Sequence, residues 1–501
     1  MRSADPPPPT PPERSARGWR RLAVEPARPA AIRDSPNAAW LVVGSVCIGA
    51  FMGQLDASIV VIALPTMQVQ LHSSLGGVEW IPLAYLLALV GCVTAVGRFS
   101  DMVGHKLIYI YGFGIFILGS LLCGLAPNLP ALIGFRLLQG LGAALLQANS
   151  VALIVQSVPA AKLGKAIGVQ GAAQALGLSL GPAIGGWLLV LGGWRLIFLV
   201  NIPAGALGMV LGWFLLPRSH HLSRREPLDW LGMGLFVIAA GSLLLGLSSG
   251  NQWGWVSLPS LGCFVVAAGF GTAFVLAELH VSAPMMRMAT FRRIPFSAGI
   301  GSGLLSYLTL FGTLFVFPYY LRFAGHMDPA QAGLRLLALP LALGVTAPLA
   351  GQVADRIGAR PLTVGGMLLV SADLVAIAVH PSLGLLLLLE LVLLGIGLGA
   401  FTPANNAAIM GAVPRQQSGM ASGILNMTRG LGTATGVATA GLIFGLATGT
   451  SVAHTRSPHL VAAGLVAAAI LLAVTAALAA LVAALRGRAP LNSDPAMAPV
   501  A

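Results

Sequence analysis

Charged residues are scarce in this chain. Asp, Glu, Lys and Arg make up 9% of its 501 residues, whereas apolar residues make up 56%. A soluble domain carries about a quarter charged residues, and a soluble chain of this length would form two or three domains, each with a polar surface. The composition excludes that class. Because open sheets do not survive in lipid and no alternating barrel pattern is present, it predicts an all-α polytopic membrane protein.

The sequence also has few features of a metal, cofactor or nucleotide protein. Its four cysteines are scattered through apolar runs and lack the close spacing of a disulfide framework or a zinc site. It contains no Gly-x4-Gly-Lys-Ser/Thr loop for ATP. We therefore expect no metal and no cofactor, and an ion gradient as the energy source.

Apolar runs long enough to cross a bilayer recur along most of the chain. A transmembrane helix needs about 20 apolar residues, and fourteen windows meet this criterion. The predicted spans cover residues 39–63, 80–97, 107–126, 131–155, 166–190, 195–216, 228–248, 257–277, 294–318, 332–353, 361–379, 383–402, 418–445 and 460–485.

The distribution of basic residues predicts the orientation of these spans. Loops after even-numbered spans carry most of them, for example Arg98 and Lys106 after span 2, and both terminal tails are basic. By the positive-inside rule, both termini are expected in the cytoplasm, with the protein in the cell (inner) membrane. The net charge of +13 reflects this topology and favours contact with the anionic surface of the lipid bilayer. No nucleic-acid partner is expected.

An internal repeat divides the chain into two similar units. A Gly-x3-Asp-x2-Gly-x-basic loop follows span 2 and returns after span 10, at an offset of 254 residues (351 minus 97). The first copy contains Gly97, Asp101, Gly104 and Lys106, and the second contains Gly351, Asp355, Gly358 and Arg360. Spans 5 and 13 match at nearly the same offset, as do spans 4 and 12. Parallel repeats with a site between them are a transporter architecture.

The repeat and the spans together predict the domain organisation. It comprises a disordered cytoplasmic tail (1–38), a six-helix bundle (39–216), a linker with two additional spans (217–293, with spans at about 228–248 and 257–277), a second six-helix bundle (294–486) and a second disordered tail (487–501).

An aspartate interrupts the first apolar run. Asp56 lies between Trp40 and Leu64, and a carboxylate at membrane depth costs several kcal/mol unless it is paired, protonated or in contact with water. Chains keep such a residue mostly where something must bind or a proton must move. Asp56 is therefore the first candidate for a functional residue.

Several ordered segments between residues 39 and 486 resemble the motifs of a known family. The loop from Gly97 to Lys106 resembles motif A of the major facilitator superfamily. The run from Arg136 to Ala144, which includes Gln139, resembles motif B of its drug exporters. Span 5 is similar to motif C, the antiporter motif, through Gly177, Gly181, Pro182, Gly185 and Gly186.

Other segments are similar to the fourteen-span drug:proton antiporter family of that superfamily. They are the string from Leu55 to Pro65, the run Trp194-Arg195 to Asn201-Ile202-Pro203, and the stretch from Ser418 through Asn426 and Arg429 to Gly432. One position departs from the pattern, since Met102 follows the motif A aspartate where members usually carry a basic residue; the second copy keeps Arg356 after Asp355.

The resemblance implies that spans 1, 2, 4, 5, 9, 10, 12 and 13 line a central cavity. Asp56 lies shortly before the end of an outward-running span, and Arg136 and Glu390 shortly after the starts of inward-running spans, each roughly 10 Å from the outer face. They are therefore expected to form a proton-titrating cluster. Structural ion pairing is the alternative for Arg136 and Arg429. Gln139, Asn426 and Arg429 are candidate cavity residues, and Asp373 is favoured as a packing residue.

The repeated loops have two explanations of equal weight. The motif A loops are candidate gates, with Asp101 and Asp355 as latches between the bundles. The alternative is that each aspartate only caps the start of a neighbouring helix. The motif C residues are expected to provide close helix packing rather than substrate contacts.

These features predict a proton-driven efflux antiporter. Its partners would be protons and a small amphipathic or cationic substrate, moved by alternating access, and a monomer is expected. A major facilitator importer or uniporter is the runner-up. A membrane-embedded enzyme would need a polar constellation that the spans lack, and a sensor would need a longer exposed loop.

Overall fold

The computed structural model describes residues 25, 28–218, 229–281, 284, 288–413, 418–448 and 457–486. Within these residues the regular elements are helices, and fourteen helical segments are long and apolar enough to span a membrane. The predicted all-α class and span count are confirmed. The predicted tail at residues 1–38 contains a short helix, α1 (Ala30–Arg33); residues 1–24 and the tail at 487–501 lie outside the described residues.

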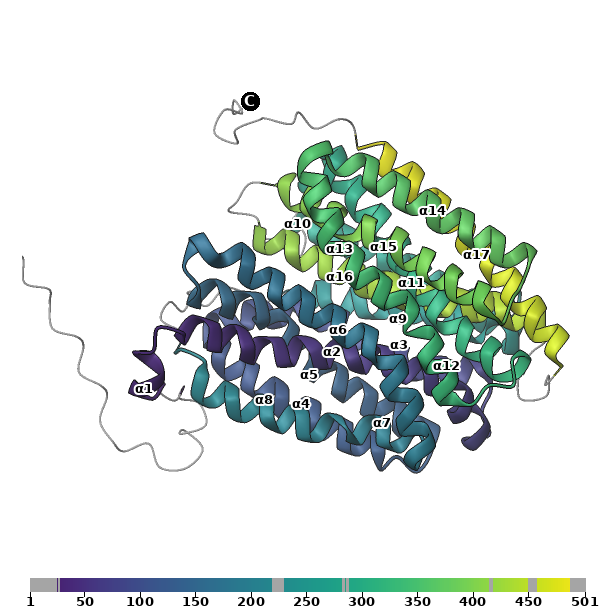
Figure 1. Ribbon diagram of the computed structural model, residues 1–501, viewed down its shortest axis with the longest axis horizontal. Helices are drawn as coiled ribbons and strands as arrows, with labels where there is room; N and C mark the ends of the chain where they lie inside the picture. The colour runs from purple at the N-terminus through teal and green to yellow at the C-terminus, as the bar shows by residue number, and fades with distance from the viewer. Residues whose placement is uncertain are drawn as a thin grey trace, which may run out of the picture.

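The first six-helix bundle contains α2 to α8, drawn in purple to blue-green in Figure 1. Its last span consists of two consecutive helices, which together cover Arg195–Leu215. The helices are α2 (Ala38–Gln70), α3 (Leu75–Val103), α4 (His105–Gly124), α5 (Leu129–Ser157), α6 (Ala160–Gly192), α7 (Arg195–Leu199) and α8 (Asn201–Leu215).

The second bundle contains α11 to α17 and lies beside the first (Figure 1). Its first span ends in a short π-helical turn, η3 (Tyr320–Ala324), and its second consists of α12 (Pro329–Leu336) followed by α13 (Ala338–Ile357). The other helices are α11 (Ile294–Tyr319), α14 (Ala359–Val379), α15 (Leu385–Gly411), α16 (Ser418–Thr448) and α17 (Pro458–Ala484).

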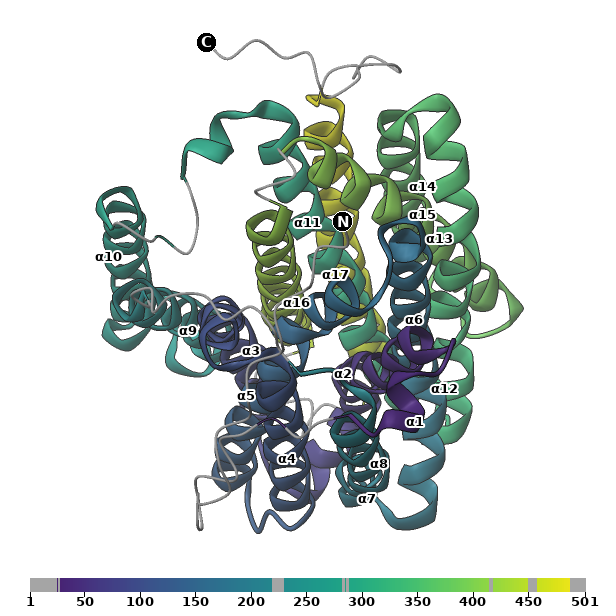
Figure 2. The same cartoon turned by 90° about the vertical axis from the view of Figure 1, so that its left-hand side faces the viewer.

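The inserted helix pair lies at one side of the two bundles. Helix α9 (Trp230–Trp253) packs against both α3 and α16, so it contacts both bundles. Trp80 of α3 donates a hydrogen bond of 3.0 Å to Ser248 of α9. Helix α10 (Leu258–His280) packs against α9 and is the outermost helix on this side (Figure 2).

Short polar caps begin several of the helices. The side chains of Ser74, Asn128 and Asp328 accept backbone N–H groups at the starts of α3, α5 and α12, as expected for Ser, Asn and Asp at N-caps. Gly104 and Gly358 separate α3 from α4 and α13 from α14 with φ of 120° and 86°. They occupy matching positions of the repeat (358 minus 104 is 254), so both copies use glycine to make the same turn.

Basic residues lie beside the two glycine turns at one end of the molecule. We call the end that carries the Gly104 and Gly358 turns the basic end, because Lys106, Arg356 and Arg360 lie beside these turns. We call the other end the opposite end; it carries the loop between α2 and α3 and the start of α12.

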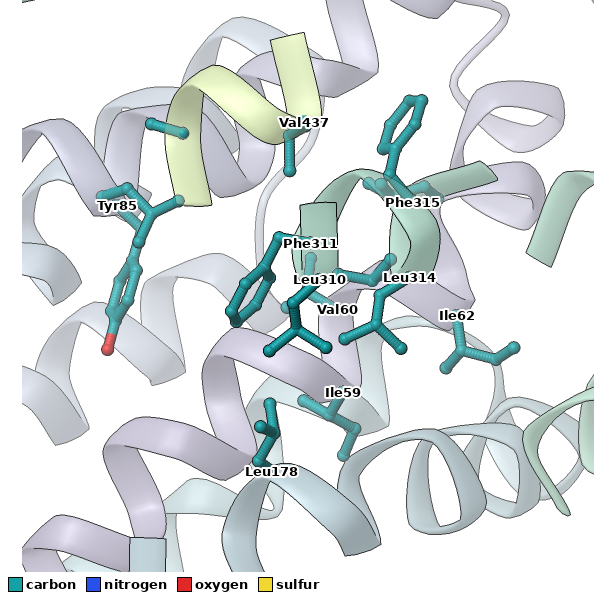
Figure 3. Packing of buried hydrophobic residues seen from close by; sticks show 14 of the residues in the cluster. Ile59, Val60, Ile62, Tyr85, Leu178, Leu310, Phe311, Leu314, Phe315 and Val437 are labelled. Atoms are coloured by element: carbon teal, nitrogen blue, oxygen red, sulfur yellow. The ribbon is translucent and has the colours of Figure 1, made fainter. Parts of the chain in front are cut away.

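The bundles are packed together toward the opposite end. Helix α6 contacts α12 with backbone against backbone: a Cβ added to Gly186 would lie 2.2 Å from the Pro329 carbonyl oxygen, and one added to Gly333 would lie 2.1 Å from that of Pro182. Beside this contact, apolar side chains of α2 and α11 interdigitate in an apolar layer that includes Ile59 and Leu314 (Figure 3). The layer closes the space between the bundles at this level.

Candidate functional site

A cavity of about 460 Å³ lies between the two bundles, on the basic side of the apolar layer. Its walls come from α2, α3, α5 and α6 of the first bundle and from α11, α13, α15 and α16 of the second. These are the eight spans expected to line it. The volume is in the range of small-molecule sites.

The described wall of the cavity combines apolar surface with neutral polar groups. Its amide side chains are Gln54, Gln147, Gln174, Asn406 and Asn426. Gln147 donates to Asn426 at 3.4 Å, which joins the two bundles across the cavity.

The charged side chain on this wall is Arg429 of α16, and none of the described lining residues is acidic. The guanidinium carbon of Arg429 lies 5.2 Å from the centre of the Tyr307 ring, a cation–π distance. Its Nε is buried and has no hydrogen-bond partner among the residues that the structure describes. The described wall of the cavity therefore presents one positive charge.

An ion pair lies beside the cavity inside the first bundle. Arg136 Nη1 of α5 is 2.6 Å from Asp56 Oδ2 of α2, and both side chains are 0% exposed. Arg136 also donates through Nε to the Ile81 carbonyl oxygen of α3 at 3.0 Å. The pair therefore joins three helices at membrane depth.

Two amide side chains complete the surroundings of Asp56. Gln139 Nε2 and Asn201 Nδ2 each donate to Asp56 Oδ1 at 2.8 Å. Gln139 Oε1 accepts from Arg136 Nη1 at 2.7 Å, and its Nε2 donates to Ser120 Oγ at 2.6 Å. Asp56 thus accepts from three donors, which is the hydrogen-bonding pattern of an ionised carboxylate.

Tyr85 separates the ion pair from the cavity. Its ring lies 4.3 Å from the guanidinium carbon of Arg136 and also forms part of the cavity wall. A separate small space, which shares Tyr85 with the cavity wall, is bordered by Arg136 and by Phe311 and Val437 of the second bundle. Arg136 Nη2 finds no hydrogen-bond partner within the described ranges. Arg136 is therefore the member of the pair that contacts a residue of the cavity wall and borders a space lined by the second bundle.

The structure places two of the three candidate cavity residues at the cavity and one away from it. Asn426 and Arg429 line the cavity as expected. Gln139 does not line it and is instead fully buried against the ion pair. The spacing explains this difference, since residues three apart lie on the same face of a helix and Gln139 follows Arg136 by three positions.

Glu390 does not belong to the cluster expected with Asp56 and Arg136. Its Oε2 accepts from Ser382 Oγ at 3.4 Å, and it interacts electrostatically with Asp373 of α14 and with His380. These neighbours come from the α14–α15 region of the second bundle, away from the ion pair. Its depth along α15 agrees with the expectation, but the side chain faces α14 and the loop that follows it.

Comparison with known proteins identifies the family. The model of the Major Facilitator Superfamily matches residues 46–229 and 299–496. The chain belongs to this superfamily. It is thus a major facilitator transporter, and its matched segments cover most of both bundles.

Relatives of this major facilitator include drug-resistance exporters. It is 34% identical to multidrug resistance protein Stp of Mycobacterium tuberculosis, over 82% of this chain and 76% of that protein. It is 33% identical to the tetracenomycin C resistance and export protein of Streptomyces glaucescens, over 81% and 76%, and 33% identical to the riboflavin transporter RibZ of Clostridioides difficile, over 80% and 87%.

A solved structure has the same fold. A bacterial homologue of the human lysosomal transporter Spinster, in an inward-facing and unoccupied conformation, superposes with a TM-score of 0.64. It is 17% identical, with 90% of this chain and 97% of that chain covered. At this identity the likeness concerns the fold alone.

The motif C residues of this major facilitator pack helices together. A Cβ added to Gly177 would lie 2.3 Å from the Phe51 carbonyl oxygen, and one added to Gly181 would lie 1.8 Å from Ser58 Oγ, both on α2. Gly185 also faces α2, whereas Gly186 faces α12 of the second bundle. The expected packing role agrees with these contacts.

The motif A loops lie at the basic end. Lys106 is buried, and its Nζ donates to the Leu216 carbonyl oxygen at the end of α8 at 2.7 Å. Gly97 and Gly351 have open space around the position of a Cβ. The side chains of Asp101 and Asp355 lie outside the described set, so the choice between cap and latch stays a prediction.

Two buried polar residues of this major facilitator were not expected from the sequence. Asn201 belongs to the Asn201-Ile202-Pro203 run, but nothing in that run indicated that it binds Asp56. Glu79 is 1% exposed in α3, whereas the predicted span began at residue 80. Ser74, a preferred N-cap residue before the apolar run, was the signal that α3 begins earlier.

Proposed function

We propose that this chain exports small amphipathic molecules in exchange for protons, by alternating access of the central cavity. The observation that carries the proposal is the fully buried Asp56–Arg136 pair, one aromatic ring from the cavity. A carboxylate at this depth costs several kcal/mol without its partner. The donors on both oxygens and the Arg136 guanidinium stabilise the charge of Asp56, so protonation of Asp56 would alter the contacts of Arg136 beside the cavity.

Protonation of Asp56 would couple to the cavity through Arg136. A neutral Asp56 no longer attracts the guanidinium, which keeps the Ile81 carbonyl, Gln139 and the Tyr85 ring as its neighbours. Because a buried unpaired cation is costly, Arg136 would then shift toward the polar groups or water at the cavity. A substrate against Tyr85 would oppose that shift. Proton and substrate would therefore compete for the same conformation, as antiport requires.

The proposed direction of transport depends on which end of the molecule faces the cytoplasm and on which side of the apolar layer the cavity lies. By the positive-inside rule we place the basic end in the cytoplasm. The cavity lies on the basic side of the apolar layer, where α2 contributes Gly49 to Ala57 to its wall. The packed layer and the α6–α12 contact separate the cavity from the opposite end. This arrangement supports loading from the cytoplasm and release on the other side.

The charge of the cavity narrows the class of substrate. Both amphipathic and cationic compounds were expected, but the charged group on the described wall is Arg429. In a low-dielectric cavity a positive substrate is repelled by this charge, whereas an acid can form a charge-assisted hydrogen bond with the guanidinium of Arg429. We therefore favour neutral and anionic aromatic compounds over cations. The drug-resistance names of two relatives are compatible with such substrates.

Transport into inverted membrane vesicles tests the proposal. Uptake of an aromatic acid, driven by an imposed proton gradient, should collapse when a protonophore removes the gradient. Undiminished uptake supported by ATP alone would exclude proton-driven antiport. Uptake that requires the reverse gradient would identify an importer, which is the runner-up function.

A further inference from the structure

A second membrane-depth acid lies at the contact between the bundles. Glu79 is in the second turn of α3, near the opposite end, and is 1% exposed. A Cβ added to Gly441 of α16 would lie 2.1 Å from Glu79 Oε1. The carboxyl of the first bundle therefore rests directly on the α16 backbone of the second, in a space that only glycine leaves open.

One carboxyl oxygen of this acid lacks a hydrogen-bond partner in the described part of the chain. Among the described residues, Glu79 Oε2 has no hydrogen-bond partner, and neither has the buried hydroxyl of Tyr319 on α11, which interacts with Glu79 electrostatically. Tyr319 is held among Phe315, Phe323 and Phe444. Three elements of two bundles thus meet at a carboxyl that lacks the donors found around Asp56.

The charged and titratable groups near Glu79 do not neutralise it. Tyr319 is the titratable residue that faces it from α11, and α16 presents Gly441. Arg136 of α5 donates to the Ile81 carbonyl, but its ion pair is with Asp56. Among the described residues, no cation forms an ion pair with Glu79. An ionised carboxylate in this position would cost several kcal/mol, whereas a protonated carboxyl costs far less.

We propose that Glu79 is a second proton-binding site, which carries a proton while α3 and α16 are in contact and releases it to water when they separate. Separation of the two helices at the opposite end exposes the carboxyl, so the proton passes to water there and a carboxylate remains. The helices close again only after Glu79 has taken up a proton from the same side. Low pH at that side therefore favours closure.

This proposal rests on alternating access in the proposed function but does not require proton-driven export. It makes Glu79 a link between pH and the closed state of the opposite end. Asp56 would act on the cavity side of the apolar layer, and Glu79 on the α3–α16 contact. The two sites can therefore be separated by experiment.

A reporter cysteine at the apolar layer tests the link. Val61 is 3% exposed and borders the narrow space with Phe311 and Val437. Purified full-length Val61→Cys is labelled with a water-soluble maleimide between about pH 5.5 and 8.5, alone and combined with Glu79→Gln. The parent chain without Val61→Cys reports the labelling of the four native cysteines. No substrate and no gradient are present, so failure of proton-driven export does not affect the result.

We expect labelling of the Val61→Cys chain to exceed that of the Glu79→Gln double variant severalfold at high pH, and the two to agree at low pH. Comparison at each pH cancels the pH dependence of thiol reactivity. Equal labelling of both chains at every pH would overturn the proposal. A pH-dependent opening that persists in the Val61→Cys/Glu79→Gln chain but is lost in a Val61→Cys/Tyr319→Phe chain would also overturn it, because the titrating group would then be Tyr319.

A substitution on the other bundle keeps the test independent of the folding of Glu79→Gln. Gly441→Ala places a methyl group where Glu79 Oε1 lies. The methyl group should displace the carboxyl and raise labelling at Val61→Cys severalfold even at low pH. Unchanged labelling in Gly441→Ala would show that the α3–α16 contact does not depend on the position of the Glu79 carboxyl against Gly441. That result would contradict the proposal.

Discussion

Asp56 of α2 and Arg136 of α5 form a 2.6 Å ion pair that is fully excluded from solvent, and both residues are bound by the same side chain, Gln139. The pair belongs entirely to the first bundle, although Arg136 also borders a space shared with the second. A structural ion pair and a proton-coupling site share this geometry. They differ in what happens when the charge is removed.

A double-mutant cycle separates these two roles. Removing one partner of a buried pair typically costs about 3–5 kcal/mol, because the other charge stays buried and unpaired. We expect Arg136→Gln to lower the melting temperature, and Asp56→Asn/Arg136→Gln to recover much of the loss without restoring transport against a gradient. Thermal unfolding and vesicle uptake provide the two readouts. Recovery of both stability and uphill transport in the double variant would assign the pair a structural role only.

Arg429 is expected to set the charge preference of the cavity. A hydrogen bond to a charged group contributes about 1.5–3 kcal/mol, so Arg429→Gln should weaken binding of an aromatic carboxylate by roughly 10- to 100-fold. The carboxamide of the same compound should bind about equally to both proteins. Binding to purified protein by calorimetry measures both constants. Equal losses for acid and amide would indicate that Arg429 shapes the cavity without selecting charge.

The glycines of the α6–α12 contact are expected to favour closure of the opposite end. A methyl group at Gly333 would lie 2.1 Å from the Pro182 carbonyl, and a backbone atom cannot move aside cheaply. Gly333→Ala should therefore increase labelling at Val61→Cys. Gly114→Ala is the matched control, because a Cβ there has open space. Labelling that is the same in both variants would contradict the role of this contact.

The motif A aspartates are expected to differ in importance. If the loops act as latches, Asp101→Asn and Asp355→Asn should each shift accessibility toward one side while substrate affinity stays similar. We expect the smaller shift at Asp101, since Met102 follows it where Arg356 follows Asp355. Cysteine accessibility at both ends measures the shift. Wild-type behaviour in both variants would leave helix capping as the role of these residues.

Apolar length, the internal repeat and the family resemblance were sufficient for the architecture but not for the side-chain environment. The fourteen spans, the two bundles and the eight cavity helices follow from apolar length, repeat offset and family motifs, which are properties of the chain. Depth along a helix is also readable from the sequence, since it increases by about 1.5 Å per residue. The sequence alone therefore places Asp56 and Arg136 at one level of the membrane.

The direction in which a side chain points could not be read in the same way. Glu390 has the expected depth, but it faces Ser382 and Asp373, because rotation of α15 is fixed by packing against its neighbours. Asn201 and Glu79 gain their significance from contacts with distant segments. Gln139 was predictable in principle from its three-residue spacing after Arg136.

Glu390 provides a test of this geometric distinction. Because it lies with Asp373 rather than with Asp56, Glu390→Gln should retain uphill transport close to the wild-type rate. The partial loss expected from a shared cluster should be absent. Uptake driven by a proton gradient in vesicles measures it, and a loss comparable to that of Asp56→Asn would restore Glu390 to the coupling site.

Proton release from purified protein tests the central claim most directly. A transported aromatic substrate is added to the protein in weakly buffered solution, and the pH change is recorded for wild type and for Asp56→Asn, which preserves shape while removing the charge. Substrate binding is measured separately in both. The wild type should release protons on binding, whereas Asp56→Asn should bind a neutral substrate and release none. Equal proton release by the two proteins would contradict the assignment of Asp56 as the coupling residue.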